Sequence, residues 1–421
     1  MMIQSPDTTN QPLTMPVLIG GLRSDKGLLL LTSIIFFLSP ILALPLIFYG
    51  VYHRKRGSFL MLALFMGVMG WLFAPMHDLY RHTLTYHYYE RNPFSAAINP
   101  INLALNGASS FVFWAFSHSG IPFEMMRTII VIISFYLLCV VFNYMIDHSS
   151  RIYSKQGVFV RFIIFLLFFD MFYVIEGIRY GFSMCIYLYA LHQLINLGNK
   201  RNFVLLSIFA GCWHLAFLYF GGVTFVMYCM RMKRRTYILF FFIMLLGILL
   251  LLSQAASIIG EQRANWYLSG RGDKLAQYSG MTAIGLTVYL LLKFAAIPYA
   301  VLVFRYYATD KKWVRMAMGW IFLSLSISFN AVFFYRSWWV FTTIGIFAFL
   351  EIEEYAPIGR RWLTTLFLSS ILFCSVATTR FHSYIQYSDY YRLFQPVPYI
   401  LTQTYDQKWT NYNVKLSGEH K

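Results

Sequence analysis

The chain has 421 residues, of which 58% are hydrophobic, and its formal net charge is +17. A soluble domain of this size has too little polar surface to cover so much apolar material, so the composition excludes a soluble globular protein. Apolar runs of about 18 residues or more recur along the chain, the length that spans roughly 30 Å of hydrocarbon. We therefore predict an all-α polytopic membrane protein, because a β-barrel would show short alternating strands.

The basic residues lie largely in short turns between the apolar runs. This placement is typical of the positive-inside rule and of contact with anionic membrane lipid. No soluble segment is long enough for a nucleic-acid domain, so nucleic acid is not a predicted partner. The five cysteines lie within apolar runs without a CxxC pair and are interpreted as buried hydrophobic residues.

Residues 1–26 are polar, and the first span is predicted over Gly27–Val51, kinked by its two prolines. The basic turn HRKR that follows is assigned to the cytoplasm. The second span is predicted over Ser58–Pro75, which places the long segment after it outside. Its apolar piece, Ile101–Phe116, is short for a span and is predicted to be a re-entrant or interfacial helix.

Spans three to five are predicted over Met125–Ile146, Val158–Ile175 and Tyr180–Leu197. Glu176 and Arg179 stand between the last two. An acid and an arginine this close to the hydrocarbon mark a functional-site candidate by default.

The run Asn202–Met230 has basic sequence at both ends and fewer than 30 residues, whereas two full crossings need about 40. We predict a pair of shortened helices that line a cavity and meet near His214, either at the step Gly211–His214 or at the glycine pair that follows Phe220. The alternative interpretation is one long tilted helix, which would invert the topology of everything after it.

The remaining spans are predicted at Tyr237–Leu252, Ile284–Phe304, Ala317–Val332, Trp338–Leu350 and Trp362–Thr378. This gives about twelve crossings, with both termini outside. The transmembrane domain then covers residues 27–379. Residues 380–421 form a Tyr-rich C-terminal tail, whose tyrosines suit the membrane interface or stacking on sugars.

With this topology, arginines outnumber acids on the outer side, which is the reverse of the positive-inside rule. The planar guanidinium fits phosphate and carboxylate oxygens, so we predict an outer anionic ligand: a lipid diphosphate, a phospholipid headgroup or an acidic sugar. The outer polar residues are Asp78, Arg81, Glu176, Arg179, His214, Arg263, Arg271, Arg336 and Arg380.

These candidates also have structural interpretations. Glu176 and Arg179, at i and i+3, suit a plain helical ion pair. Arg336 and Arg380 suit snorkelling interfacial anchors. His214 suits a buried, hydrogen-bonded histidine, and Asp78 suits a helix cap. No metal-ligand spacing, GxGxxG or P-loop appears, so no metal or nucleotide cofactor is predicted.

Two stretches carry a family resemblance. Arg179 opens a span, YGFSMCIYLYALHQL; the basic turn GNKRN follows, and the next span, FVLLSIFAGCW, ends at His214. Asp78-Leu79-Tyr80 provides an acidic-aromatic motif after the second span. In these features the chain resembles the bacterial O-antigen and capsule repeat-unit polymerases (the Wzy family), in particular its EpsG-like branch.

The resemblance implies a GT-C-like glycosyltransferase of the bacterial inner membrane that needs no metal, cofactor or nucleotide sugar. It would transfer a growing glycan from one undecaprenyl diphosphate to the sugar end of a new lipid-linked repeat unit on the periplasmic face. The product would be O-antigen, lipopolysaccharide, capsule or exopolysaccharide. Membrane lipid and a chain-length regulator are the further partners.

Loss of a diphosphate requires positive charge aimed at the negative charge that develops, and the acceptor hydroxyl requires a base. The predicted diphosphate-binding residues are Arg179, Arg336, Arg271, Arg81 and Arg380. The candidate bases are Glu176, Asp78 and His214.

Two other functions remain open. A flippase for an anionic lipid would use the same arginines for binding without chemistry, although no matching pair of broken helices indicates an inverted repeat. An O-antigen ligase would be expected to carry a much larger outer loop late in the chain than residues 253–280.

Overall fold

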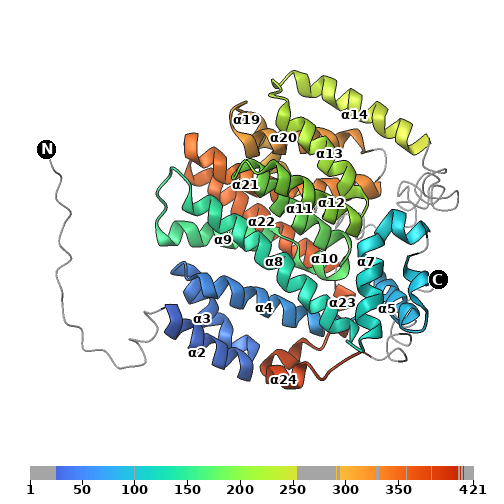
Figure 1. The fold of residues 1–421 in the computed structure, drawn as a ribbon. Coiled ribbons are helices and arrows are strands. Elements are labelled where there is room, and N and C mark those ends of the chain that lie inside the picture. Colours follow the sequence, from blue (N-terminus) through green and yellow to red (C-terminus); the bar gives the residue numbers. More distant parts are fainter. Residues whose placement is uncertain are drawn as a thin grey trace, which may run out of the picture.

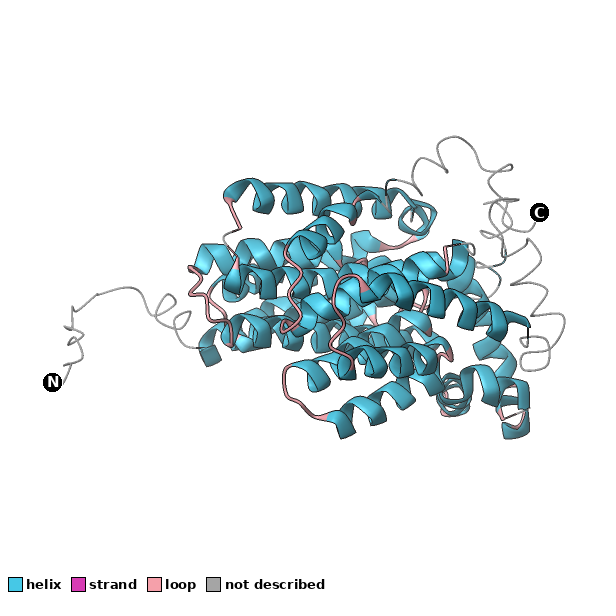
Figure 2. Cartoon of the chain, turned by 90° about the horizontal axis from the view of Figure 1, so that it is seen from above, coloured by secondary structure: helices cyan, strands magenta, loops and turns pink. Residues whose placement is uncertain are grey.

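The computed structural model describes residues 25–98, 100–253, 294–328, 331–356, 358–380 and 382–405, together with residues 291, 408 and 411. Every regular element in these ranges is a helix, as Figure 2 shows, which confirms the all-helical class for this part of the chain. By length and composition, Phe123–Asp147 and Arg360–Thr379 are able to cross a membrane. The number of about twelve crossings stays a prediction.

The helices are labelled in Figure 1 and follow one another as α2 (Asp25–Leu38), α3 (Pro40–Tyr52), α4 (Arg56–Leu72), α5 (His77–Glu90), α6 (Phe94–Ala97), α7 (Pro100–His118), α8 (Phe123–Asp147), α9 (Lys155–Phe168), α10 (Met171–Glu176), α11 (Tyr180–Ile195), α12 (Lys200–Trp213), α13 (Ala216–Cys229), α14 (Thr236–Ser253), α19 (Ile297–Arg305), α20 (Lys312–Ser326), α21 (Ala331–Tyr355), α22 (Arg360–Arg380), α23 (His382–Tyr387), the 3₁₀ helix η1 (Tyr390–Phe394) and α24 (Val397–Ile400).

The basic turns gather at one end of the helix bundle, here called the basic end. Arg54 and Asp147, from two different turns, form an ion pair. Lys312 donates a hydrogen bond to the carbonyl of Ile195 over 3.1 Å. Further bonds at this end of the bundle run from Arg161 to Glu353, from Tyr307 to Met232 and from Tyr355 to Tyr306. The turns predicted to face the cytoplasm therefore lie on one side.

The single span predicted over Gly27–Val51 is wrong, because α2 and α3 form a helical hairpin. Ser39 has an extended backbone (φ −164°, ψ 107°), and the proline that follows it cannot donate a helical hydrogen bond. A Cβ on Gly50 would lie 3.2 Å from the side chain of Leu28, so the two helices run side by side.

This hairpin also changes the predicted side of the first described residues. Asp25, at the start of α2, forms an ion pair with Lys55 in the basic turn. The chain therefore enters α2 at the basic end, and the prediction of an outer N-terminal side fails for residue 25.

The broken pair predicted in Asn202–Met230 is confirmed as α12 and α13. His214 has an extended backbone between them (φ −150°, ψ 113°), so the break falls at the step Gly211–His214. A Cβ on Gly221 would lie 3.0 Å from Cβ of Ser207, although a straight helix would separate these residues by about 21 Å. Both basic ends of the hairpin therefore face one way, and His214 lies at its tip.

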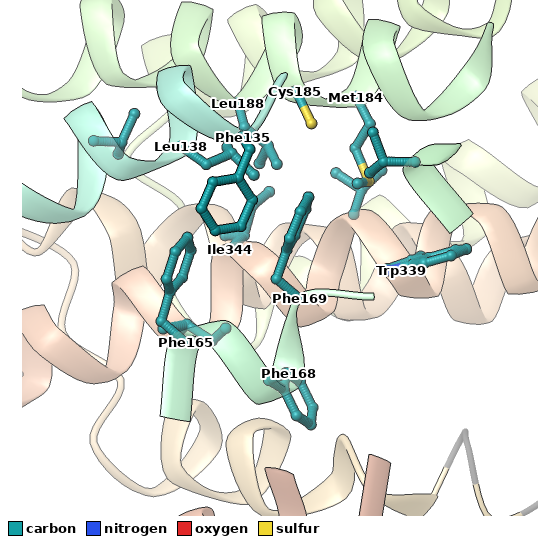
Figure 3. Packing of buried hydrophobic residues seen from close by; sticks show 14 of the residues in the cluster. Phe135, Leu138, Phe165, Phe168, Phe169, Met184, Cys185, Leu188, Trp339 and Ile344 are labelled. Atoms are coloured by element: carbon teal, nitrogen blue, oxygen red, sulfur yellow. The ribbon is translucent and has the colours of Figure 1, made fainter. Parts of the chain in front are cut away.

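The bundle core forms where α8, α9, α11 and α21 meet, as Figure 3 shows for Phe135, Leu138, Phe165, Phe168, Met184, Leu188 and Ile344. The span predicted over Val158–Ile175 is divided into two helices, α9 and α10. The division has a local cause, because the carboxylate of Asp170 accepts a hydrogen bond from the backbone N–H of Tyr173 and caps α10.

The end of the bundle opposite the basic turns is here called the site end. It holds α5 and α7, at the right of Figure 1, and the tip of the α12–α13 hairpin. The apolar piece Ile101–Phe116 lies within α7, which packs against α5 and α12. The C-terminal segment, residues 382–405, also folds back onto this end: Nε1 of Trp71 donates to the carbonyl of Gln403 over 2.6 Å.

Candidate functional site

The first two turns of α5 contribute a group of three ionisable side chains: Asp78, Arg81 and His82. Asp78 is the second residue of α5, and Met76 occupies the N-cap position, so the interpretation of Asp78 as a helix cap is wrong. Asp78 forms an ion pair with the exposed Arg81. His82 is buried one turn later, with Nε2 3.8 Å from Oδ2 of Asp78.

The turn between α10 and α11 positions Glu176 and Arg179. A Cβ on Gly181 would lie only 2.7 Å from Cα of Val174, so the absence of a side chain lets α10 cross tightly over the first turn of α11. The close crossing leaves the residues between the two helices in a short turn at the site end. Arg179 becomes the N-cap residue of α11.

The tip of the α12–α13 hairpin is attached to this turn. Nε1 of Trp213 donates a hydrogen bond to the carbonyl of Ile178 over 3.3 Å. The ring of His214 then meets the ring of Tyr180 edge to face, with centroids 5.2 Å apart. Nδ1 of His214 is buried and has no hydrogen-bond partner among the described residues.

Arg336 joins the site from α21. The sequence places it in a loop between two spans, but α21 begins at Ala331, so Arg336 stands in the second turn of a helix. Its guanidinium lies over the ring of Tyr180, 5.4 Å from the centroid. The hydroxyl of Tyr180 donates to the carbonyl of Arg336 over 2.7 Å, which fixes α21 against the start of α11.

Electrostatics connect these groups into one cluster. Burial raises the pKa of Asp78, but its interaction with His82 and the charges of Arg81, Arg179 and Arg336 together outweigh burial and lower it. Burial and the nearby charge of Arg179 lower the pKa of His82 to about 3, so His82 is neutral at pH 7. The arginines therefore keep Asp78 ionised at neutral pH. His214 lies in the field of Arg336, Arg179 and Asp78.

We call the group Asp78, Arg81, His82, Arg179, His214 and Arg336 the arginine cluster. Five of its six members are predicted site residues that the fold brings together from α5, the α10–α11 turn, the α12–α13 tip and α21. Such a cluster presents three guanidinium groups, two imidazoles and one carboxylate at one site. This combination has the chemistry to bind a doubly charged oxyanion and to leave groups nearby for proton transfer.

Glu176 faces the C-terminal segment. Its Oε1 accepts a hydrogen bond from the hydroxyl of Tyr384 over 2.7 Å. Arg380 ends α22, and its side chain lies outside the described residues. Arg263 and Arg271 also lie outside them.

Sequence reasoning missed several side chains at the site end. His82 carries a usable signal, since it follows Asp78 by four residues and shares its helix face. Tyr180 and Tyr384 carry none, because their roles depend on partners far away in the sequence. The same holds for Arg127, which is fully buried in α8 and donates to the carbonyl of Trp71 over 3.0 Å. Among the described residues, no group of three or more His, Cys, Asp or Glu is placed to hold a metal ion.

The apolar helices run between a basic end and a polar cluster, an arrangement that fits a helical membrane protein. The EpsG family model matches residues 77–400, well over half of the chain, and the protein belongs to the EpsG family. This family places it among the membrane proteins of polysaccharide biosynthesis, in the class of glycosyltransferase-type polymerases. No curated protein and no solved structure matches the chain.

Proposed function

We propose that the protein polymerises undecaprenyl-diphosphate-linked oligosaccharide repeat units into O-antigen, capsule or exopolysaccharide. The observation that supports this best is the arginine cluster. Tyr180, the neighbour of Arg179, lies 156 residues from Arg336 in the sequence, yet its hydrogen bond to Arg336 holds the two arginines at one site. The cluster lies at the end of the bundle opposite the basic turns, which would place it on the periplasmic side of a bacterial inner membrane.

The reaction is a glycosyl transfer between two lipid-linked glycans. A hydroxyl oxygen of the acceptor repeat unit forms a bond to the anomeric carbon of the donor glycan. The bond from that carbon to the diphosphate oxygen breaks, and its electron pair stays on the leaving undecaprenyl diphosphate. The proton of the hydroxyl passes to a base of the protein and then to solvent. The acceptor lipid now carries a glycan longer by the whole donor chain.

The arginine cluster supports the leaving-group half of this step. Arg179 and Arg336 would bind the diphosphate and stabilise the charge that develops on it. Asp78 would orient the arginines, because a carboxylate among several guanidinium groups organises them without neutralising all of their charge. His214 would contact the same anion through its ring N–H. No metal ion or nucleotide has a part in this scheme.

The four helices α10 to α13, which position Glu176, Arg179 and His214, are short. α10 has six residues, α11 has 16, and α12 and α13 have 14 each, so the longest of them extends about 24 Å. Helices shorter than the roughly 30 Å hydrocarbon core suit a cavity that opens between them at one membrane face. This arrangement is consistent with a GT-C-like fold of about twelve crossings.

Purified protein in lipid nanodiscs tests the proposal. The probe is the lipid-linked repeat unit extracted from a source strain that lacks the gene, and the readout is the ladder of product lengths. We expect the wild type to form chains of many repeats, and Arg179→Ala and Arg336→Ala to lower the rate by about 100-fold or more, as loss of transition-state charge stabilisation does. Arg360→Ala, which removes an exposed arginine at the basic end, is the matched control and keeps full activity.

The same probe separates polymerisation from transport and ligation when the protein is also reconstituted in liposomes. Movement of the probe across liposomes without any elongation would indicate a flippase and refute the proposal. Full activity of both site variants at normal protein levels would refute the assignment of the arginines. Products that contain one glycan joined to a different lipid acceptor would indicate a ligase.

A further inference from the structure

The C-terminal segment supplies a buried tyrosine to the candidate acid Glu176. Tyr384 is 1% exposed and Glu176 is 8% exposed, and their hydrogen bond joins residues 208 positions apart. The ring of Tyr384 stacks on Phe73, with centroids 4.8 Å apart and planes at 22°. This stacking fixes the direction of the hydroxyl, so the position of the Glu176 carboxylate depends on the C-terminal segment.

The same segment also holds the corner between α4 and α5. The backbone N–H of Ala74 donates to the hydroxyl oxygen of Ser388 over 2.8 Å. The hydroxyl of Tyr405 donates to the carbonyl of Leu72 over 2.7 Å. This corner leads directly into α5 and Asp78. The C-terminal segment is therefore attached to both walls of the site, the start of α5 and the end of α10.

The other two candidate bases have partners that oppose the acceptance of a proton. Asp78 is ion-paired with Arg81 and lies among further arginine charges, which stabilise its ionised form. His214 lies within reach of the charges of Arg179 and Arg336, which would repel a third positive charge there. A carboxylate held by a tyrosine hydroxyl in a buried position has the geometry of a fixed base.

We propose that Glu176 accepts the proton of the acceptor hydroxyl and that Tyr384 is its positioning residue, so that the C-terminal segment is a working part of the active site. This inference rests on the proposed glycosyl transfer. Glu176 takes the proton in the step that forms the new glycosidic bond, while the electron pair of the broken bond leaves with the diphosphate. Tyr384 keeps its own proton and acts only through Glu176.

The test is a double-mutant cycle in the nanodisc elongation assay, with the lipid-linked repeat unit from the deletion strain as the probe. Tyr384→Phe keeps the ring on Phe73 and removes only the hydroxyl. We expect it to lower kcat by about tenfold, the effect of one hydrogen bond to a charged group, with KM changed by less than about twofold. Glu176→Gln is expected to lower kcat by about 100-fold or more. Tyr391→Phe, an exposed tyrosine of the same segment, is the matched control and is expected to retain wild-type kcat and KM.

The double variant separates positioning from a general structural role. If Tyr384 acts through Glu176, Tyr384→Phe has no further effect once Glu176 is replaced by Gln. An additive loss in the double variant overturns the positioning role, and wild-type kcat in Tyr384→Phe does so as well. Full activity of Glu176→Gln alongside inactive Arg179→Ala overturns the base assignment but leaves the proposed function standing. A wild-type protein that elongates nothing overturns both.

Discussion

Replacing Gly211 with Ala tests whether His214 stands at the tip of a helical hairpin. In the structure a Cβ at Gly211 would lie 2.2 Å from Cγ and 3.0 Å from the backbone nitrogen of Leu218. Contacts this short require a backbone shift, because one of the two is to the main chain. In a single straight helix, residues seven apart would be separated by about 10 Å, and the same Cβ would meet nothing there.

The magnitude follows from two opposing effects. Ala is a better helix former than Gly by about 1 kcal/mol. Overpacking at a close contact costs about 1–3 kcal/mol. Gly211→Ala should therefore be less stable than Gly222→Ala by about 1–3 kcal/mol, the overpacking term alone. Gly222 is the matched control, because it lies in α13 of the same hairpin and a Cβ there has nothing within 4 Å.

The assay is the apparent free energy of unfolding in mixed micelles, measured for both variants and the wild type. We expect Gly222→Ala to gain stability and Gly211→Ala to be neutral or to lose it. Adding Leu218→Ala should restore part of the loss, because it removes the side-chain half of the clash. Equal gains in both glycine variants would refute the hairpin and favour one continuous helix over residues 202–230.

Other outcomes follow from the same structure. Glu353→Gln should destabilise the protein by about 3–5 kcal/mol, since it leaves a buried guanidinium without its charged partner, whereas Glu354→Gln next to it should have little effect. Burial and the charge of Arg179 lower the pKa of His82 from 6.5 to about 3, so between these values the unfolded chain binds more protons and stability falls as pH falls. Relative to His82→Gln, the wild type should lose about 2 kcal/mol between pH 7 and pH 5. Single cysteines in place of Asp25 and Lys200 should react with a membrane-impermeant reagent from the same side, because both positions lie at the basic end.

Each of these has a result that would count against it. Equal stability of the two glutamate variants in thermal unfolding would mean that the pair at the basic end does not hold α9 to α21. If the stability of the wild type and of His82→Gln depended equally on pH, the His82 ring would be in contact with water. Labelling of the two cysteines from opposite sides would restore the single first span that the sequence predicts.

Several helices follow from the sequence pattern alone, because their bounds depend on hydropathy and local charge. The span predicted over Met125–Ile146 is α8 almost to the residue, and Tyr180–Leu197 is α11 within two residues. The short run between two basic turns predicts the α12–α13 hairpin, since 29 residues are too few for two full crossings. Its break at His214 also agrees with the prediction.

Local backbone chemistry explains where the predicted spans and the observed helices differ. The hydropathy of Gly27–Val51 is that of one span, and Ser39 with the proline after it decides that it folds back. The carboxylate of Asp170 starts a new helix inside a continuous apolar run. Arg336 lies on a helix because α21 begins at Ala331, seven residues before the span predicted from Trp338.

The sequence by itself determined that the chain is a helical membrane protein with basic turns on one side, and it identified the ionisable residues that stand apart from those turns. Hydropathy and charge decide this because each residue contributes independently of its distant neighbours. Only the tertiary structure decided which of those residues meet. Tyr180 joins Arg336 to His214, and Tyr384 binds Glu176 across 208 positions, and such contacts depend on how helices pack and not on any local pattern.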